Sequence, residues 1–130
     1  MNKYASVLVV EDDKTSAFLL KLLLIESDLV QSISVAANGQ EAIDYLDRLK
    51  ANGTRYPDVI FLDINMPLMD GFEFLETCRR VGCFANGTVR VIILTSSAHR
   101  EDILRAQAFG VADYLVKPVS AEAILAALGN

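Results

Sequence analysis

The chain has 130 residues, the length of one domain, and 52% of them are apolar while 22% are charged. This composition is typical of a globular protein with its own core and excludes a disordered chain. The formal net charge of −5 opposes binding to DNA, RNA or an anionic membrane. We therefore expect a single domain over residues 1–130 with no effector domain, no nucleic-acid partner and no membrane partner.

The cysteines and the N-terminus give no sign of export. Cys78 and Cys83 lack the spacing of a metal knuckle and form no disulfide framework. The apolar run at residues 7–10 is too short for a signal peptide, and no run reaches the ~20 apolar residues of a membrane span. These observations predict a cytoplasmic protein with reduced thiols.

Strand and helix signals alternate along the chain. Short apolar runs predict strands at residues 7–10, 32–36, 59–62, 89–94 and 114–116. Apolar residues at helical spacing predict helices at 14–26, between Asn38 and Asn52, after Asp70–Gly71, and at 100–109 and 120–128. The first helix is predicted from its apolar residues Phe18, Leu19, Leu22, Leu23 and Ile25.

Five strand–helix units in succession predict a parallel sheet with helices on both faces. The strands are continuous apolar runs without alternation, as expected of strands that are covered on both sides. The expected fold class is therefore α/β, with a doubly wound, flavodoxin-like sheet of five parallel strands in the order 2-1-3-4-5.

Reactive side chains follow four of the five predicted strands. In a sheet of this order the carboxyl ends of those four strands are neighbours, and ligands bind at that edge. Each residue alone has a simpler explanation, such as a helix N-cap for Asp13, but their conjunction at one edge is specific. The residues are Glu11, Asp12 and Asp13 after the first strand, Asp63 after the third, Thr95 at the fourth and Lys117 after the fifth.

The chemistry of this set favours a metal ion and phosphoryl transfer. Two carboxylates 4 Å apart repel by about 1 kcal/mol in water and by ~4 kcal/mol at an effective dielectric of 20, so the cluster needs a cation. Oxygen ligands without His or Cys favour Mg²⁺, Ca²⁺ or Mn²⁺, and a site with few protein ligands favours Mg²⁺. A carboxylate is also a competent phosphoryl acceptor when positive charge surrounds the transferred group.

Four sequence blocks resemble the marker blocks of bacterial response-regulator receiver domains, of the single-domain, chemotaxis-regulator-like kind. They occur in the expected order, and the resemblance covers almost the whole chain. The blocks are Val9–Asp13, Phe61–Gly71, Leu94–Ser97 and Tyr114–Pro118.

The resemblance implies a Mg²⁺-dependent reaction that places a phosphoryl group on Asp63. It further implies that Asp12 and Asp63 bind the metal directly, that Glu11 acts mainly through water, and that the backbone carbonyl of Asn65 completes the site. The acidic pair is Glu-Asp where Asp-Asp is the commonest pattern in this family.

The resemblance also assigns the switch and phosphate-binding residues. Thr95 resembles the switch hydroxyl, Tyr114 the switch aromatic and Lys117 the phosphate-binding lysine, and the bond from Lys117 to Pro118 is expected to be cis. The side chains that border the path of the hydrolytic water are then Asn65 and Ser97. Both are small and polar, which predicts self-hydrolysis within minutes.

The implied function is a stand-alone response regulator, a switch protein that is not an enzyme but assists its own phosphorylation and dephosphorylation. Its implied phosphodonor is a sensor histidine kinase or a histidine phosphotransfer protein. The surface of the fourth helix, fifth strand and fifth helix is expected to change on phosphorylation. A downstream protein, a phosphorelay partner or a second copy would then bind through residues 98–128.

The last predicted helix favours such a docking face. Ile124, Leu125 and Leu128 are sufficient to anchor it in the core, while its outward positions are mostly alanine with a single charge. A solvated helix face normally carries several charges. Alanine is also simply a good helix former, so the pattern alone leaves both explanations open.

Three other functions fit parts of the sequence. A haloacid-dehalogenase-like phosphatase would need an acid two residues after its nucleophile, and Asn65 occupies that position. A flavodoxin-like FMN protein would need a Ser/Thr/Gly-rich loop after the first strand, where acids stand instead. A degenerate receiver acting as an interaction module would lack key residues, and here all are present.

Overall fold

The structure is a computed structural model that describes residues 3–82, 89–96 and 99–129. Strands and helices alternate throughout, as predicted. The elements are β1 (Tyr4–Val10), α1 (Lys14–Ser27), β2 (Val30–Ala36), α2 (Gly39–Ala51), β3 (Val59–Asp63), α3 (Gly71–Val81), β4 (Arg90–Thr95), α4 (Arg100–Ala108), β5 (Asp113–Val116) and α5 (Ala121–Gly129).

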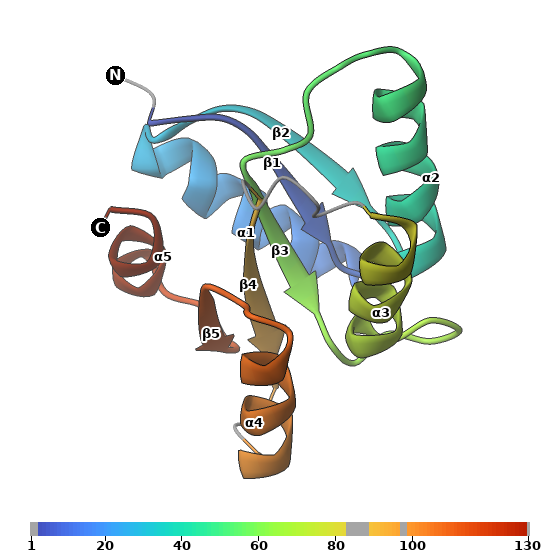
Figure 1. The fold of residues 1–130 in the computed structure, drawn as a ribbon. Coiled ribbons are helices and arrows are strands. Elements are labelled where there is room, and N and C mark those ends of the chain that lie inside the picture. Colours follow the sequence, from blue (N-terminus) through green and yellow to red (C-terminus); the bar gives the residue numbers. More distant parts are fainter. Residues whose placement is uncertain (1–2, 83–88, 97–98, 130) are drawn as a thin grey trace.

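The five strands form one parallel sheet in the order β2-β1-β3-β4-β5 (Figure 1). β1 pairs with β2 and β3, and β4 pairs with β3 and β5. Val10 lies opposite Leu62 and Asp63 opposite Leu94, so β1, β3 and β4 end side by side. The expected flavodoxin-like fold and strand order are confirmed.

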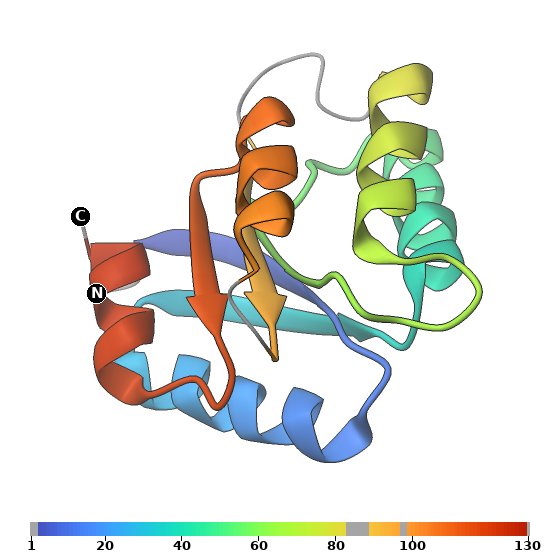
Figure 2. The ribbon, with the colours of Figure 1, turned by 90° about the horizontal axis from the view of Figure 1, so that it is seen from below.

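Helices cover both faces of the sheet, which is why the strands are apolar throughout. Figure 2 shows α1 and α5 on one face and α2, α3 and α4 on the other. Val7 and Val9 belong to the core on the α1 and α5 face, whereas Leu8 and Val10 belong to the opposite core. Because alternate side chains enter different cores, every residue of β3 is buried.

Side-chain caps fix the start of three helices close to the carboxyl edge of the sheet. Asp13 accepts a hydrogen bond from the Ser16 amide at the start of α1, and Asn38 caps α2 in the same way. Asp70 and Glu73 form a reciprocal capping box at the start of α3. The predicted N-cap role of Asp13 is therefore confirmed.

The N-terminal strands are longer than predicted. β1 begins at Tyr4, three residues before the expected position, and β2 begins at Val30, directly opposite Tyr4. The Tyr4 hydroxyl donates to the Leu128 carbonyl at 2.8 Å and accepts a hydrogen bond from Arg90 at 2.9 Å. These contacts join the start of β1 to the end of α5, which a local apolar pattern does not reveal.

The buried faces of α1 and α5 differ from those suggested by the apolar residues. α1 is buried through Ala17, Leu20 and Leu24, and four of the five residues that predicted the helix are exposed. α5 is buried through Ile124, Ala127 and Leu128. The prediction that Leu125 belongs to the core is wrong, because its side chain is 47% exposed. The exposed residues of α1 are Phe18, Leu19, Leu22 and Ile25.

Among the described residues, no helix combines the length and the apolar character needed to span a membrane. The longest, α1, has 14 residues, whereas a span needs about 20.

Gly71 sets how closely α3 approaches the end of β3. A Cβ atom at this position would lie 2.7 Å from the Ile64 Cα and 2.9 Å from the Asp63 carbonyl oxygen. Both obstacles are backbone atoms, so the Asp63–Ile64 backbone would have to move to accept any side chain.

Gly71→Ala should therefore lower the free energy of unfolding by about 1–3 kcal/mol, the usual cost of overpacking. Urea denaturation measures the change. Gly129→Ala is the matched control, because a Cβ there meets no atom within 4 Å. Equal stability of the two variants would contradict the close approach of α3 to β3.

Candidate functional site

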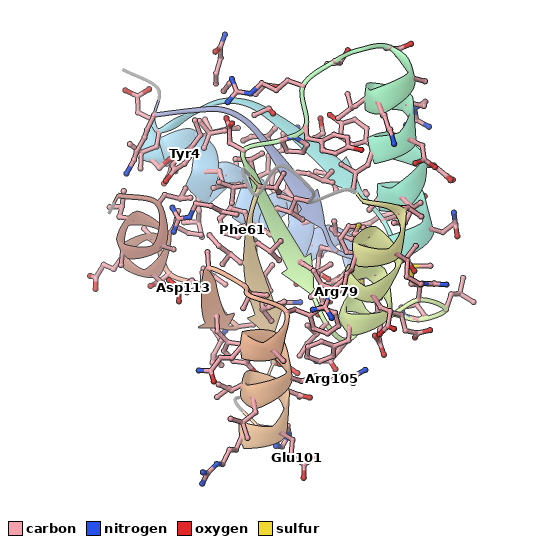
Figure 3. All side chains as sticks on the ribbon, viewed as in Figure 1. Tyr4, Phe61, Arg79, Glu101, Arg105 and Asp113 are labelled. Atoms are coloured by element: carbon pink, nitrogen blue, oxygen red, sulfur yellow. The ribbon has the colours of Figure 1, made fainter. Side chains whose placement is uncertain are left out.

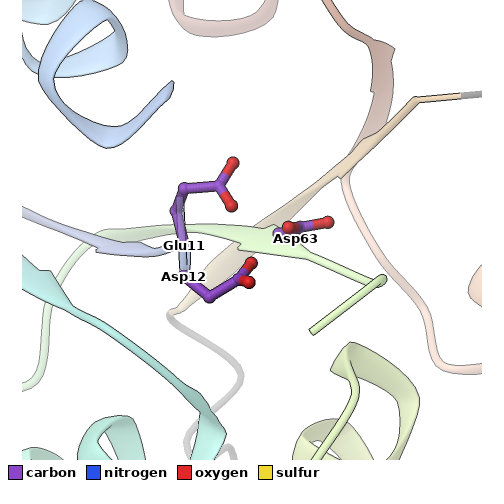
Figure 4. A group of neighbouring side chains, drawn as sticks. All are labelled: Glu11, Asp12 and Asp63. Carbon is purple, nitrogen blue, oxygen red and sulfur yellow. The ribbon is translucent and has the colours of Figure 1, made fainter. Parts of the chain in front are cut away.

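Three carboxylates meet where β1 and β3 end. Glu11, Asp12 and Asp63 each offer an oxygen, and these oxygens all lie within 4.8 Å of one another (Figure 4). Glu11 and Asp63 are each only 3% exposed, whereas Asp12 is exposed. Two of the three acids are therefore buried beside each other, where water screens their repulsion poorly.

Lys117 supplies the positive charge at this cluster. Its ammonium group forms a close ion pair with the Glu11 carboxylate and lies 3.3 Å from Asp63 Oδ2. The backbone amide of Lys117 donates to the Thr95 carbonyl at 2.7 Å. That bond fixes the start of the side chain at the end of β4, from which it reaches β3 and β1.

The pKa values of this pair follow from burial and from the neighbouring charges. Burial raises the pKa of Glu11 to about 7, and the adjacent Asp63 carboxylate acts in the same direction, while Lys117 opposes both. Burial alone would lower the pKa of Lys117, but its hydrogen bond to Glu11 and the charge of Asp63 outweigh burial and raise it. Lys117 therefore stays protonated, and Glu11 is the group whose ionised form the cluster disfavours.

Local hydrogen bonds hold the carboxylates in place. The backbone amide of Asn65 donates to Asp63 Oδ1 at 2.9 Å, whereas Asp63 Oδ2 faces Lys117. The Asp13 amide donates to Glu11 Oε2 at 3.3 Å. The Asp13 carboxylate itself turns to α1, and the hydrogen bond from the Ser16 hydroxyl lowers its pKa.

The other predicted residues lie along the same edge of the sheet. Thr95 ends β4 and is fully buried, opposite Val116 of β5. Tyr114 is partly buried against the core on the α2, α3 and α4 side. The bond between Lys117 and Pro118 is cis, as the resemblance implies.

Two residues considered in the sequence lie outside the described part of the chain. These are Ser97, at the expected water path, and Cys83. Cys78 is buried in the core on the α2, α3 and α4 side.

The ion pair between Lys117 and Glu11 was not predicted from the sequence, where Lys117 was assigned to the phosphoryl group alone. The sequence feature that could have indicated this ion pair is the glutamate at position 11, where an aspartate is the commonest residue. The additional methylene of a glutamate extends its carboxylate toward a lysine on the far side of β4.

The donor set fits a hard divalent cation. Three carboxylates face one ammonium group, so two negative charges remain unbalanced when all four groups are ionised. The described ligands are oxygens, which Mg²⁺ prefers. Asp12 is exposed and leaves the site open to an ion and its water ligands.

The comparisons with known proteins give one consistent result. The family model described as "Response regulator receiver domain" matches residues 7–129. This chain belongs to that family. Receiver domains are signalling switches of two-component systems; they interact with histidine kinases or phosphotransfer proteins and bind Mg²⁺ at an acidic pocket.

Related sequences include proteins of very different lengths. The sensor histidine kinase CheAY of Helicobacter pylori is 33% identical over 116 residues, which cover 89% of this chain but 13% of that protein. The probable methanogenesis regulatory protein FilR2 of Methanothrix harundinacea is 31% identical, covering 89% of this chain and 74% of that protein. The chain thus matches a small part of some relatives and most of others.

Solved structures agree over nearly the whole chain. A two-component response regulator from Cytophaga hutchinsonii has a TM-score of 0.89 and 31% identity, with 98% of this chain and 96% of that chain covered. The chemotaxis protein CheY4 of Vibrio cholerae has a TM-score of 0.78 and 30% identity, with 96% of each chain covered. The receiver fold is thereby shown independently of the motifs.

Removing one exposed carboxylate tests the charge imbalance. Asp12→Asn should weaken Mg²⁺ binding and leave the metal-free protein equally or more stable, because it removes repulsion together with a ligand. Mg²⁺ should raise the thermal midpoint of the wild type by mass action and that of the variant less.

Thermal melts with millimolar Mg²⁺ and with a chelator measure both effects. Asp47→Asn, an exposed acid on α2, is the control and should respond to Mg²⁺ like the wild type. A wild-type midpoint that is indifferent to Mg²⁺ would contradict the metal site.

Proposed function

We propose that this protein accepts a phosphoryl group on Asp63 in a Mg²⁺-dependent reaction and acts as a phosphorylation-controlled switch. The observation that carries the proposal is the buried Asp63 carboxylate, which lies among two further acids and 3.3 Å from Lys117. An Asp63 oxygen forms the new P–O bond while the P–N bond of a phosphohistidine, or the P–O bond of acetyl phosphate, breaks. The donor retains the electron pair of that bond: the histidine nitrogen then takes up a proton, whereas acetate leaves as the carboxylate anion.

Lys117 and Thr95 stabilise the transferred group in this proposal. Lys117 already contacts Asp63 Oδ2, so a phosphoryl group on Asp63 would carry oxygens within reach of the ammonium group. Thr95 ends the neighbouring strand, where its hydroxyl would donate to a phosphoryl oxygen. Positive charge and donors around the equatorial oxygens are what phosphoryl transfer requires.

The metal ligands in the proposal are the carboxylates of Asp12 and Asp63 and the backbone carbonyl of Asn65. Glu11 acts mainly through water, since its carboxylate is already held by Lys117 and the Asp13 amide. When bound, Mg²⁺ supplies positive charge to the phosphoryl oxygens.

Asn65 favours the switch over a hydrolase. A phosphatase with an aspartate nucleophile needs a proton donor two residues further on, and the Asn65 side chain is a neutral amide. Asn65, together with Ser97, is proposed to border the path of the water that returns the protein to its resting state. The proposed phosphodonor is a sensor histidine kinase or a histidine phosphotransfer protein.

Labelling of Asp63 is the direct test. Acetyl phosphate with Mg²⁺ should add one phosphoryl group to the wild type, and intact-mass spectrometry should detect the adduct. Asp63→Asn should abolish it, because an amide is no nucleophile for this transfer. Asp47→Asn should be labelled normally, and full labelling of Asp63→Asn at another residue would exclude Asp63 as the acceptor.

The proposed output surface consists of α4, β5 and α5. α4 is held loosely: of its residues, Ala106 alone is buried, and β5 is an edge strand without a fully buried residue. Leu104 and Leu125 expose large apolar side chains on α4 and α5. A loosely held element is the kind that a modest free-energy change can shift.

Stacked side chains attach α4 to α3. The rings of Phe72 and Phe109 stack with centroids 6.2 Å apart. The Arg105 guanidinium lies 4.3 Å from the Phe72 ring centroid, and that of Arg79 lies 4.4 Å from the Phe109 ring centroid. Figure 3 labels the two arginines, Arg79 on α3 and Arg105 on α4. Phe72 stands in the first turn of α3, next to Gly71. Movement at the Asp63–Gly71 loop would therefore reach α4 through this stack.

Mapping with a phosphoryl mimic tests the output surface. Beryllofluoride with Mg²⁺ should change amide chemical shifts around Asp63 and also in residues 100–128, since Thr95 and Lys117 would both move toward the mimic. α2 lies outside this route and should change little. Shifts confined to the carboxylate site, with residues 100–128 unaffected, would contradict this output surface.

A further inference from the structure

The two edge strands of the sheet differ in how they are protected against pairing with a further strand (Figure 1). β5 has only four residues and begins with the charged Asp113. β2 has seven residues, and its sequence VQSISVA contains no charged residue and no proline. Its register with β1 is continuous from Ser32 to Ala36. Short length, charge, proline and bulges are the features that usually protect an edge strand, and this stretch of β2 has none of them.

Two residues of β2 present their backbone groups to the outer side of the sheet. The Ala36 carbonyl accepts a hydrogen bond from the Glu11 amide and therefore faces β1. Alternate residues of a regular strand direct their N–H and C=O groups to the same side, so Ser34 also faces β1, whereas Ile33 and Val35 face outward. Within the described residues, no strand pairs with that side of β2.

The side chains of these two residues suit a cross-strand contact. Val35 is exposed, and Ile33 is only partly buried against the core on the α1 and α5 side. Both are apolar and β-branched, and such residues fit the half-buried surface between paired strands. A strand added at this edge would therefore gain side-chain contacts as well as backbone hydrogen bonds.

The flank of α1 on the side of β2 is also apolar and exposed. α1 faces the sheet through Ala17, Leu20 and Leu24, and its Leu19 and Leu23 line a cavity with Pro118 and Val119 of the segment between β5 and α5. At about 3.6 residues per turn, the opposite flank carries a stripe formed by Phe18, Leu22 and Ile25, which are exposed. Lys21 lies beside this stripe and is long enough to keep its ammonium group in water.

The charges near the two ends of β2 favour a second, antiparallel copy of the strand. The cavity beside Gln31 near the amino end has three cationic residues and one acid in its lining, Lys3, Arg55, Arg90 and Asp58. The cavity beside Val35 and Ala36 near the carboxyl end has two acids and one cation, Glu41, Asp44 and Arg48. Antiparallel pairing brings unlike ends together twice, whereas parallel pairing would bring like ends together.

We propose that two copies of this chain form a dimer in which β2 pairs with β2 antiparallel across a two-fold axis. A two-fold contact uses the same patch on both copies and closes the assembly at two. The register that pairs both outward residues places Ile33 opposite Val35 of the second copy, twice, with Ser34 at the axis. Each such pair exchanges two backbone hydrogen bonds, so the pairing supplies about four.

This pairing brings the apolar stripes on α1 together. The axis is perpendicular to the sheet, so both copies of α1 lie on the same face. Strands are about 4.8 Å apart, and α1 packs on both β1 and β2, so the two helices would lie roughly 10 Å apart, the spacing of packed helices. The carboxylate site, the surface between α1 and the β5–α5 segment, and the surface of α4, β5 and α5 all remain open on each copy.

Sedimentation velocity of the full, unphosphorylated chain tests the dimer. Standard-sized interfaces have dissociation constants in the micromolar range or tighter, so the dimer should form at about 100 μM and dissociate on dilution. Val35→Lys puts a charge on the edge, and Phe18→Ala shortens the α1 stripe, so each should weaken dimerisation about fivefold or more. Leu125→Ala, a matched exposed apolar residue on α5, should leave dimerisation unchanged. A monomer at 100 μM, or a loss in Leu125→Ala but not in Val35→Lys, would overturn the proposal.

Cysteine cross-linking tests the register, in a chain that carries Cys83→Ser. Ser34→Cys should form a disulfide between copies, because facing residues of a non-hydrogen-bonded antiparallel pair have Cα atoms about 4.5 Å apart. Ser32→Cys is the control, since the two copies of this position would be about 13 Å apart along the strands. Cross-linking at position 32 in preference to 34, or equally at both, would overturn the register.

Amide hydrogen exchange separates this dimer from one formed through the output surface. The amides of Ile33 and Val35 should gain protection as the concentration rises, whereas those of Ser32 and Ser34 already face β1 and should change little. Because β2 is remote from residues 100–128, beryllofluoride with Mg²⁺ should leave this protection unchanged. A dimer that forms only with beryllofluoride, or one that leaves Ile33 and Val35 unprotected, would overturn the assignment of β2 as the interface.

Discussion

Glu11 and Asp63 are both buried at the end of adjacent strands, and Lys117 is the positive charge placed against them. One ammonium group cannot neutralise three ionised carboxylates. The remaining repulsion is large, because two like charges 4 Å apart repel by ~4 kcal/mol at an effective dielectric of 20. Burial, together with the neighbouring Asp63 carboxylate, raises the pKa of Glu11. The site therefore favours whatever brings positive charge, and Mg²⁺ is the simplest source.

The strand order determines which residue can place a positive charge against Asp63. β1 and β3 are neighbours, so their terminal acids meet directly, whereas β4 separates β3 from β5. A side chain from the end of β5 must cross the end of β4 to reach Asp63, and a lysine is long enough. The Lys117 side chain also lines a cavity with largely apolar walls between α1 and the segment that joins β5 to α5. Lys117 thus contacts the acidic cluster through its side chain and the end of β4 through its backbone amide.

The fold could be predicted from the sequence because its strongest signals are local. Continuous apolar runs such as Val59–Leu62 belong to strands covered on both faces, and Asp13, Asn38 and Asp70 cap the helices that follow. The strand order also predicted that the residues after the strands lie together, because neighbouring parallel strands end at the same edge of the sheet. The helix faces were harder: Leu125 and Phe18 are apolar but exposed, since burial depends on which neighbour a helix packs against.

Contacts between distant side chains could not be predicted either. The stack of Phe72, Phe109 and two arginines joins residues of α3 and α4 that no periodicity connects. The pairing of Lys117 with Glu11 likewise depends on side-chain reach across β4. In both cases the backbone topology brings the elements together, and rotamers decide which groups touch.

The position of Lys117 in the activated state tests this account most directly. A crystal structure with Mg²⁺ and beryllofluoride bound should show the metal on Asp12 and Asp63 and the Lys117 Nζ hydrogen-bonded to a fluoride. The ion pair with Glu11 should be longer than in the resting protein. A metal bound elsewhere, or a Lys117 that remains on Glu11 with no contact to the fluoride, would contradict the central role given to this charge.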